Sequence, residues 1–210
     1  MVSNDKSINV VCNINEAYVQ HCGVMLCSLF MNNKNEHFIV HILHFSITEK
    51  SQSVLADFVK SFGNEIYFYK VKQLGFDLPN LKSHYISAET YLRLLITRYV
   101  PNDIDKILYL DVDMIVLGCI RELFSTNLDG VLLGAIQDSP NPVRQERLDI
   151  PKENGYFNAG VMLLNLAYWR AQHITEKSIA FIKDHPEKIR QHDQDVLNLS
   201  LIHISEPTRP

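Results

Sequence analysis

The sequence predicts an α/β fold whose central sheet is mostly parallel and is flanked by helices on both faces. Short apolar runs rich in β-branched and aromatic residues alternate along the chain with segments whose apolar residues recur at helical spacing. This order is typical of parallel sheets, because parallel neighbours need a long crossover that is usually a helix. The 210 residues contain no internal repeat and no low-complexity linker, so we predict a single domain.

Three strands and three helices are predicted in the first half of the chain. The strands are the apolar runs 8–13, 38–45 and 65–71. The helices run from Tyr18 to Met31, from Thr48 to Phe62 and from Ser87 to Tyr99. Gly63 ends the second helix and Pro101 stops the third, since glycine favours a left-handed cap and proline cannot continue a helix. The less regular stretch 72–87 is expected to carry binding loops.

The second half continues the alternation with a long polar interruption. Strands are predicted at 106–117, 131–138 and 156–166. The segment 138–155 contains three prolines and is interpreted as a loop. Helices are predicted at 175–185 and from about residue 192. In a parallel sheet of this kind, ligands bind at the carboxyl ends of the strands.

Composition and charge exclude several classes of protein. The net charge of −4 and the pI near 6.1 provide no basic surface for nucleic acid. No run of 18 or more apolar residues could form a transmembrane helix. The four cysteines form no CxxC pair and lie in apolar segments, at Cys12, Cys22, Cys27 and Cys119. We interpret them as reduced core residues of a cytosolic protein, with a zinc or redox role as the alternative.

The last twelve residues, LSLIHISEPTRP, are treated separately. They break the helical pattern of the preceding QDVLN and resemble a conceptual translation of a sequencing adapter. We therefore expect the catalytic domain to span residues 1–198, to be incomplete at its C-terminus and to be followed by a non-native tail at 199–210. The alternative is an ordinary polar tail.

Two aspartates interrupt the apolar run KILYLDVDMIVL at 106–117. In an extended strand Asp111 and Asp113 point the same way, and if the chain turns at Val112 they can still converge beyond the strand end. Two neighbouring carboxylates repel each other unless a positive charge lies between them. Oxygen ligands favour a hard divalent ion such as Mn²⁺ or Mg²⁺, which in turn attracts phosphate. The alternative is a pair of solvated charges in a turn.

Three further features are candidates for ligand contacts. Arg93 lies among apolar residues of a predicted helix, either as a cation that reaches water at the core edge or as a clamp for phosphate and carboxylate. Asn158 lies between an aromatic and two small residues, where it could bind a sugar hydroxyl or mark a bulge in an edge strand. The run His192 to Asp195 places three acceptor-bearing groups at a helix start, and helix capping explains only one of them.

With LYLDVD, YFNAG and HDQD in this order, the chain resembles the family-8 glycosyltransferases, which include bacterial lipopolysaccharide galactosyl- and glucosyltransferases and the glycogenins. The likeness runs from about Ile8 to Asn198. It implies a GT-A nucleotide-sugar fold, dependence on Mn²⁺ (or Mg²⁺), a UDP-sugar donor and transfer of a hexose with retention. It also implies a saccharide or glycolipid acceptor and a cytoplasmic setting with peripheral contact at the inner face of the membrane. The oligomeric state stays open.

The resemblance assigns roles to twelve residues. The metal ligands that hold the diphosphate are Asp111 and Asp113, with Val112 between them in the donor site. The uridine contacts are Asn13, Asn15 and Tyr18, with Tyr18 stacked on the base. The contacts to donor sugar and phosphate are Arg93, Asp138, Asn158 and Ala159. The catalytic face is formed by Asp138, Asp193 and Gln194.

The chain departs from the family pattern at two places. The family commonly has Asp and Asn in its first loop, where this chain has Asn15 and Ala17. The family's third metal ligand is a histidine in a downstream HxGxxKPW-like motif, which does not occur in this sequence; we do not transfer the role to His203. We therefore expect weak metal binding by this stretch of chain.

Two other functions compete with hexosyl transfer. Asn15 and Ala17 are compatible with a non-catalytic nucleotide-sugar-binding domain. A phosphatase with a DxDx[TV] nucleophile loop needs Thr or Val where this chain has Ile115, and it normally has that loop after the first strand.

Overall fold

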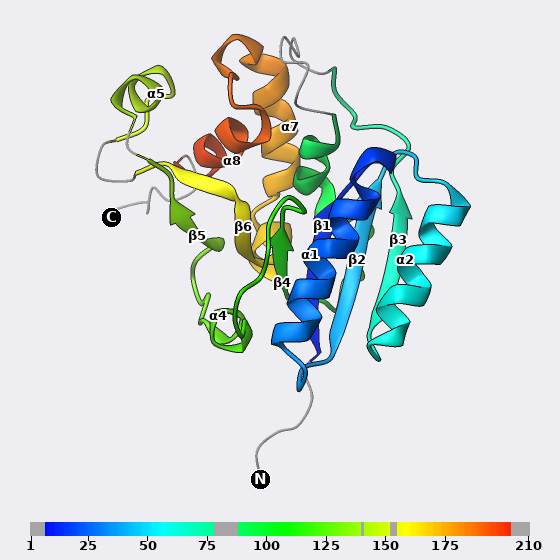
Figure 1. Cartoon of the computed structure of the whole chain (residues 1–210). Coiled ribbons are helices and arrows are strands. Elements are labelled where there is room, and N and C mark those ends of the chain that lie inside the picture. Colours follow the sequence, from blue (N-terminus) through cyan, green and yellow to red (C-terminus); the bar gives the residue numbers. More distant parts are fainter. Residues whose placement is uncertain (1–6, 78–87, 140, 152–154, 203–210) are drawn as a thin grey trace.

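A computed structural model of the chain describes residues 7–77, 88–139, 141–151 and 155–202. Within these residues six strands form one sheet in the order β3-β2-β1-β4-β6-β5 (Figure 1). The strands are β1 (Ile8–Asn13), β2 (Phe38–His44), β3 (Glu65–Lys70), β4 (Lys106–Leu110), β5 (Leu133–Gln137) and β6 (Phe157–Asn165). The pairs β2–β3, β1–β2 and β1–β4 are parallel, while β4–β6 and β5–β6 are antiparallel. The prediction of a mostly parallel sheet is confirmed, with an antiparallel edge.

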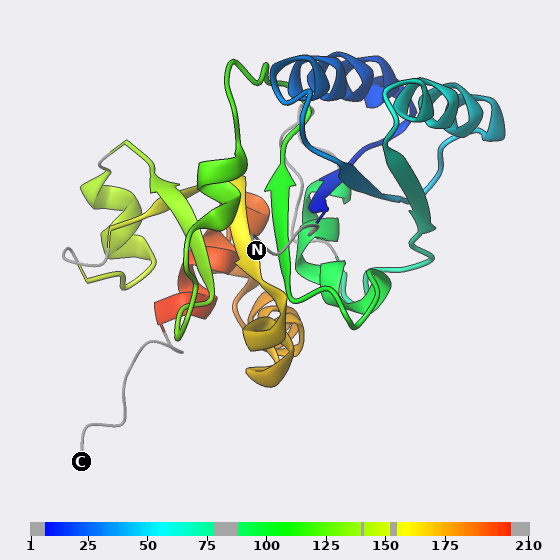
Figure 2. The same cartoon turned by 90° about the horizontal axis from the view of Figure 1, so that it is seen from below.

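Helices cover both faces of this sheet. The α-helices are α1 (Val19–Asn32), α2 (Glu49–Ser61), α3 (Ile96–Tyr99), α4 (Arg121–Ser125), α5 (Pro142–Arg147), α6 (Leu166–Ala171), α7 (Ile174–Asp184) and α8 (His192–Ile202). The 3₁₀ segments within the described residues are η1 (Glu16–Tyr18), η2 (Ala88–Leu95) and η4 (Pro186–Lys188). Figure 2 shows α1 and α2 together on one side of the sheet, with η2, α7 and α8 on the other.

Two hydrophobic cores result from this arrangement. The first lies between the sheet and the pair α1–α2, where Met25, Leu29 and Phe30 of α1 pack on apolar residues of β1 and β2. The second lies on the opposite face, where Trp169 and Val196 pack beneath η2 and β4. Alternate strand residues supply the two cores, as expected for strands that are buried on both faces. The site region is therefore held by rigid elements on both sides.

The first half of the chain folds much as the sequence predicts. β1 matches the predicted strand 8–13, and α2 begins after Thr48, whose side chain accepts a hydrogen bond from the Ser51 N–H at its N-cap. Gly63 adopts a left-handed φ of 77° directly after α2, as its predicted role as a helix terminator requires.

The predicted helix from Ser87 to Tyr99 has a different form. Ser87 lies outside the described residues, residues 88–95 form the 3₁₀ segment η2, and only α3 is α-helical. A 3₁₀-helix has three residues per turn, so residues three apart lie on the same side. This winding aligns Thr90 with Arg93, and the Arg93 Nε donates to the Thr90 carbonyl at 3.1 Å.

The predicted strand 106–117 is wrong in its second half. β4 ends at Leu110, and beyond the two aspartates Ile115 and Leu117 are 54% and 85% exposed. Pairing between β4 and β6 ends near this point. The Asp111 N–H still donates to the Gly160 carbonyl at 2.8 Å, one residue beyond the end of β4. Of the two geometries expected for the aspartate pair, the structure has the one in which the chain leaves the strand near Val112.

Three short helices were not predicted. α4 and α6 lie between predicted elements, and α5 lies in the segment 138–155 that was interpreted as a loop. The sequence did contain a signal for α5, since Asn141 accepts a hydrogen bond from the Arg144 N–H as N-cap and Pro142 occupies the first turn. Pro142 thus marks a helix start within the segment that was interpreted as a loop.

Two other expectations need correction. Cys12 and Cys22 are buried, but Cys27 is partly exposed and Cys119 is exposed, so the four cysteines are not all core residues. The residues after Asn198 do not break the helix at once, because α8 continues to Ile202 and Leu199 is 3% exposed against Leu148 and Tyr156. In the described part of the chain no helix is both long and apolar enough to cross a bilayer.

Candidate nucleotide-sugar site

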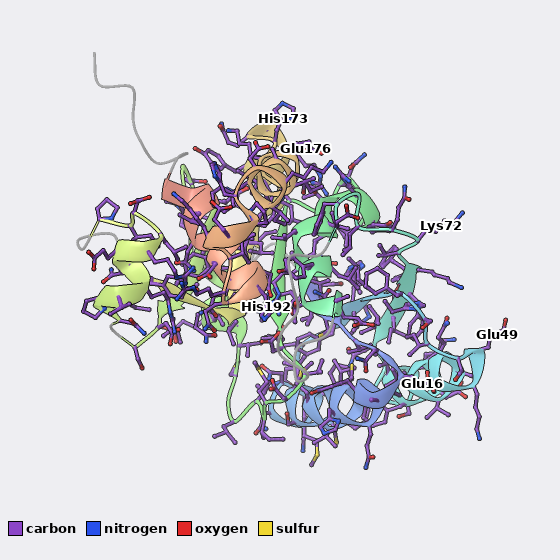
Figure 3. The ribbon with its side chains drawn as sticks, turned by 90° about the horizontal axis from the view of Figure 1, so that it is seen from above. Glu16, Glu49, Lys72, His173, Glu176 and His192 are labelled. Atoms are coloured by element: carbon purple, nitrogen blue, oxygen red, sulfur yellow. The ribbon has the colours of Figure 1, made fainter. Side chains whose placement is uncertain are left out.

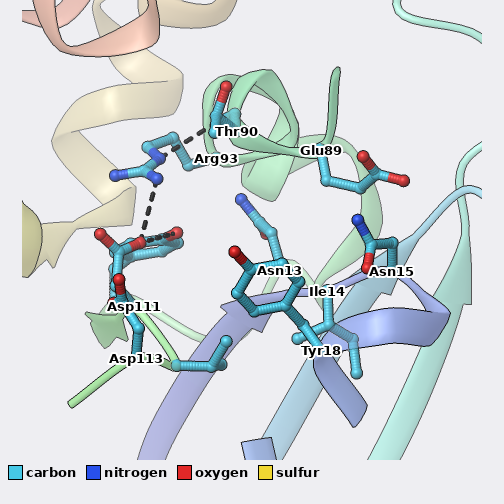
Figure 4. Close-up of a pocket in the computed structure, with 11 residues that line it drawn as sticks. Asn13, Ile14, Asn15, Tyr18, Glu89, Thr90, Arg93, Asp111 and Asp113 are labelled. Carbon is cyan, nitrogen blue, oxygen red and sulfur yellow. Dashed lines mark hydrogen bonds and ion pairs between the residues drawn. The ribbon is translucent and has the colours of Figure 1, made fainter. Parts of the chain in front are cut away.

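A cavity of about 230 Å³ opens at the carboxyl ends of β1 and β4 (Figure 4). This is the position at which ligands of open α/β sheets bind. Seven of the twelve predicted site residues line it, Asn13, Asn15, Tyr18, Arg93, Asp111, Val112 and Asp113. Its other lining residues are Ile14, Glu89, Thr90 and Tyr109. Figure 3 looks onto this end of the molecule, with Glu16 at η1 and His192 at the start of α8.

Arg93 is the centre of a buried polar network behind the cavity. Its side chain is 7% exposed, and its Nη2 donates to Asp111 Oδ1 at 3.0 Å while its Nε lies 2.9 Å from Asp193 Oδ2. Its Nη1 donates to the Ala159 carbonyl at 2.6 Å, and its guanidinium lies 4.4 Å from the centre of the Tyr109 ring. Arg93 is thus not a cation that reaches water at the core edge, because its Nε, Nη1 and Nη2 each bond an acceptor of the protein. Nη1 and Nη2 each carry a second N–H, and a role for Arg93 as a phosphate clamp stays a prediction.

Asp111 has one oxygen engaged and one oxygen left over. Oδ1 accepts from Arg93 and from the Tyr109 hydroxyl, the latter at 2.8 Å. Oδ2 has no donor among the described residues and faces Gly160, where an added Cβ would lie only 2.9 Å from it. Glycine at position 160 is therefore required by the close approach of a carboxylate to the backbone. Oδ2 keeps its lone pairs for another ligand.

Asp193 lies at the inner end of the network. Burial raises the pKa of its carboxyl to about 6, against the opposing effect of Arg93 and together with the negative charge of Asp111. Its neighbour His192 adopts a left-handed φ of 51°. The His192 and Tyr91 rings are perpendicular, with their centres 6.2 Å apart. Positive φ is uncommon for a residue with a side chain, so the start of α8 is held by its surroundings.

The Gln194 amide connects α8 to β6 and to the end of β5. Its Oε1 accepts the Ala159 N–H at 3.0 Å, and its Nε2 donates to Asp138 Oδ2 at 3.2 Å. Asp138 Oδ2 also accepts from Arg144 Nη1 at 2.7 Å, and Oδ1 accepts the Ser139 N–H. Partial burial alone would raise the pKa of Asp138, but the bonds from Arg144 and Ser139 outweigh it and hold the pKa below its usual value. Asp138 is therefore ionised at neutral pH.

Asn13 and Asn15, unlike Arg93 and Gln194, have buried polar atoms without hydrogen-bond partners among the described residues. Both polar atoms of the Asn13 side chain and the Oδ1 of Asn15 are buried without a hydrogen-bond partner in the described structure. Buried polar atoms nearly always have a partner, because leaving one unpaired costs about 1–3 kcal/mol. These amides face the cavity from the end of β1 and the turn after it, which marks them as groups that a ligand satisfies.

The remaining predicted residues lie at the rim. Tyr18 is 40% exposed on η1, with its ring 5.1 Å from that of His21. Asp113 is exposed beside the cavity. Asn158 is exposed at the start of β6, where its Oδ1 accepts the Gly160 N–H at 2.8 Å. Five predicted residues do not line the cavity but adjoin it through the network, Asp138, Asn158, Ala159, Asp193 and Gln194.

Several site residues were not predicted. Tyr109 and Thr90 line the cavity, and Arg144 holds Asp138. Asp195, the last residue of the run His192 to Asp195 noted in the sequence, instead bonds Arg147 and Tyr156. Tyr109 carried a usable signal, since it lies two residues before Asp111 and therefore on the same side of the strand. Arg144 carried none, because its partner follows from how α5 packs on the sheet.

The oxygen atoms at this edge of the sheet fit a divalent cation. Oδ2 of Asp111 and the carboxylate of Asp113 are hard ligands, and Mg²⁺ typically uses one or two carboxylates together with substrate phosphates. Among the described residues no group of three or more His, Cys, Asp or Glu could hold a metal by itself. The two aspartates would therefore share such an ion with a phosphate-bearing ligand.

Comparison with known proteins identifies the family. Residues 9–205 match the sequence profile of glycosyl transferase family 8. The chain belongs to this family. The resemblance drawn from LYLDVD, YFNAG and HDQD is thereby confirmed, and a phosphatase is excluded.

Relatives of similar sequence include two lipopolysaccharide glycosyltransferases. The chain is 30% identical to the lipopolysaccharide 1,3-galactosyltransferase of Salmonella typhimurium, over 95% of this chain and 61% of that protein. It is also 30% identical to a lipopolysaccharide 1,2-glucosyltransferase of Escherichia coli, over 94% of this chain and 60% of that protein. The chain thus spans about 60% of the length of these relatives.

Solved structures confirm the fold. The galactosyltransferase LgtC, in complex with donor and acceptor sugar analogs, superposes with a TM-score of 0.86 at 28% identity, over 92% of this chain and 70% of that one. The glycosyltransferase GlyE of Streptococcus pneumoniae gives a TM-score of 0.72 at 25% identity, over 94% of this chain and 44% of that one. The predicted GT-A fold is confirmed by this likeness.

Proposed function

We propose that this protein is a metal-dependent, retaining glycosyltransferase that moves a hexose, glucose or galactose, from a UDP-sugar to a saccharide acceptor. One observation carries the proposal: a single cavity joins two carboxylates, Asp111 and Asp113, to the buried, unpartnered amide of Asn13 and amide oxygen of Asn15. A nucleotide sugar needs both sets of groups. Its base offers donors and acceptors to amides, and its diphosphate needs a cation.

The base and the diphosphate occupy the two sides of the cavity in this proposal. Asn13 and Asn15 pair with the uracil, and the exposed ring of Tyr18 stacks on it. Asp111 and Asp113 would hold Mn²⁺ or Mg²⁺ against the diphosphate, and such an ion would supply Lewis-acid stabilisation for negative charge on the leaving group. Val112 contributes backbone between the two ligands.

The acids on the far side of the network act on the sugar. Breaking the anomeric bond places positive charge on the sugar ring, which a nearby carboxylate stabilises. Asp138 suits this role because its pKa is held low and it is ionised at neutral pH. Each of the two acids is paired with an arginine, but the Asp193 side chain is only 7% exposed whereas that of Asp138 is 25% exposed, so Asp193 suits the role less directly. Asn158 at the rim is placed to contact the sugar hydroxyls.

Retention needs either a double displacement or attack from the front face. Gln194 is a weak nucleophile, and its Oε1 already accepts the Ala159 N–H. This favours front-face attack in which the leaving diphosphate assists the acceptor. The acceptor in our proposal is a saccharide or glycolipid of lipopolysaccharide or another cell-surface polysaccharide, since the relatives named above act on lipopolysaccharide.

The test is release of UDP by the full-length protein supplied with Mn²⁺, UDP-glucose or UDP-galactose, and a saccharide acceptor. We expect turnover that falls about 1000-fold in the double variant Asp111→Asn/Asp113→Asn, because several kcal/mol of charge stabilisation are lost. Asp129→Asn, the same change at an exposed carboxylate, is the control and should keep full activity. Equal activity of the double variant and the control would overturn the proposal.

The competing function gives a different result in the same assay. Asn15, in place of the acid common in the family, favours a nucleotide-sugar-binding domain without catalysis. That function predicts a rise in melting temperature with UDP and Mn²⁺ but no UDP release with any donor. It also predicts that the double variant loses the rise in melting temperature.

A further inference from the structure

The short helix α5 lies outside the cavity, and two of its arginines form ion pairs with carboxylates near the site. α5 presents Arg144 and Arg147 three residues apart, and residues at this spacing lie on the same side of a helix. Each arginine binds one carboxylate next to Gln194. Arg144 pairs with Asp138 at 2.7 Å, and Arg147 pairs with Asp195 at 3.0 Å.

The two arginines differ in what they hold. Asp195 is completely buried and also accepts the Tyr156 hydroxyl and the backbone N–H groups of Arg190 and Gln191. Arg147 therefore completes a closed structural cluster. Asp138 is 25% exposed, and Arg144 holds the oxygen of Asp138 that also accepts the Gln194 amide. Of the two arginines of α5, Arg144 is the one that binds a partly exposed carboxylate.

The bonds of Asp138 fix the orientation of the Gln194 amide. If the amide were turned over, its N–H₂ would face the Ala159 N–H and its oxygen would face the Asp138 carboxylate, which places donor against donor and acceptor against acceptor. The chain of bonds continues from Ala159 through Arg93 to Asp111. A change at Arg144 is thus connected to the cavity by groups that are all hydrogen-bonded.

Packing keeps Arg144 in place. Its guanidinium lies 4.6 Å from the centre of the Tyr156 ring, and the following residues Leu148 and Ile150 form a small core with Tyr156 and Leu199. Asn141 caps the start of α5. A planar guanidinium stacked on an aromatic ring loses less freedom when it forms a hydrogen bond than a lysine does.

We propose that Arg144 is a positioning residue for sugar transfer, which holds Asp138 and through it the Gln194 amide in the geometry used against the donor sugar. This inference rests on the proposed function. Arg144 does not line the cavity that contains Asn13 and Asp111, and the Gln194, Ala159 and Arg93 bonds separate it from Asp111. We therefore expect its main effect on sugar transfer, and a smaller one on nucleotide binding.

The experiment compares Arg144→Met, Arg144→Lys and Arg147→Met in the full-length protein. We expect Arg144→Met to lower kcat about 10- to 100-fold, the usual cost of a misplaced reacting geometry, with the Kd for UDP and the melting temperature nearly unchanged. Arg144→Lys should restore part of kcat, since it keeps the charge and one hydrogen bond. Arg147→Met should lower the melting temperature, because it leaves the buried Asp195 without its cation.

Two results would overturn the inference. One is a kcat of Arg144→Met within twofold of the wild type. The other is a loss of activity in Arg144→Met that follows a fall in melting temperature as large as that of Arg147→Met. If the wild type shows no turnover, the proposed function fails separately, and the side-chain amide resonances of Gln194 decide the positioning role. Resonances that shift in Arg144→Met support it, and unchanged resonances overturn it.

Discussion

The two sides of the candidate site satisfy their polar groups in opposite ways. On the β1 side, both polar atoms of the Asn13 amide and the Oδ1 of Asn15 are buried without a partner among the described residues. On the β6 side, Arg93, Asp193 and Gln194 are each bonded to other groups of the protein. The difference indicates a division of labour. In the proposed function, the protein builds the sugar side before any ligand arrives, and it leaves the base side for the nucleotide to complete.

The largest expected effect comes from removing Arg93, the cation at the centre of the hydrogen-bonded β6 side. We expect Arg93→Met to lower the free energy of unfolding by about 3–5 kcal/mol, because Asp193 and Asp111 lose their buried partner. Arg98→Met is the matched control. Its ion pair with Glu176 is exposed and should contribute less than about 1 kcal/mol. Urea denaturation measures both, and equal losses in the two variants would show that the network is not holding the site.

The second test uses the proton equilibrium of Asp193. Its pKa of about 6 lies above that of an unfolded aspartate, about 3.9, so the folded protein binds more protons between roughly pH 4 and 6. This group therefore makes the ligand-free protein more stable as the pH falls through that window, by about 3 kcal/mol for a shift of this size.

Asp193→Asn isolates this contribution from that of the other acids. The difference in free energy of unfolding between wild type and variant should change with pH from 6 to 4 and be constant outside that range. A constant difference throughout would mean that the pKa of Asp193 is the same in the folded and unfolded protein, so that the effect of Arg93 cancels that of burial.

The smallest expected effect concerns the β1 side, where polar atoms of Asn13 and Asn15 lack partners among the described residues. Asn13→Ala should leave the stability of the ligand-free protein unchanged or slightly higher, because it removes unpartnered polar atoms, and should weaken UDP binding by about 1–2 kcal/mol. Asn33→Ala is the inverse control. Its buried amide bonds Leu29, Gly118 and Ile120, so it should cost stability and spare UDP binding.

Calorimetry of UDP binding and urea denaturation separate the two asparagines. If Asn13→Ala destabilises the protein as much as Asn33→Ala does, the Asn13 amide has a partner within the protein. The contrast between the two sides of the site would then be lost.

Local features of the fold were predictable because their causes are local. A short apolar run located β1, and Thr48 and Gly63 located the ends of α2. The end of β4 was predicted too far along the chain, because Met114 to Leu117 are as apolar as a strand although the sheet ends before them. A hydrophobic run shows what can be buried, and only the neighbouring strand decides where pairing stops.

By itself the sequence determined the α/β order, the two aspartates after a buried strand, and the residues that the family resemblance assigns to the site. The tertiary structure decided the antiparallel direction of β6, since a strand buried on both faces has the same pattern in either direction. It also decided which charges are paired, which amides are left open, and that Arg144 of a short helix holds Asp138. These depend on distances between segments far apart in the chain, and a burial energy or a pKa exists only once those segments meet.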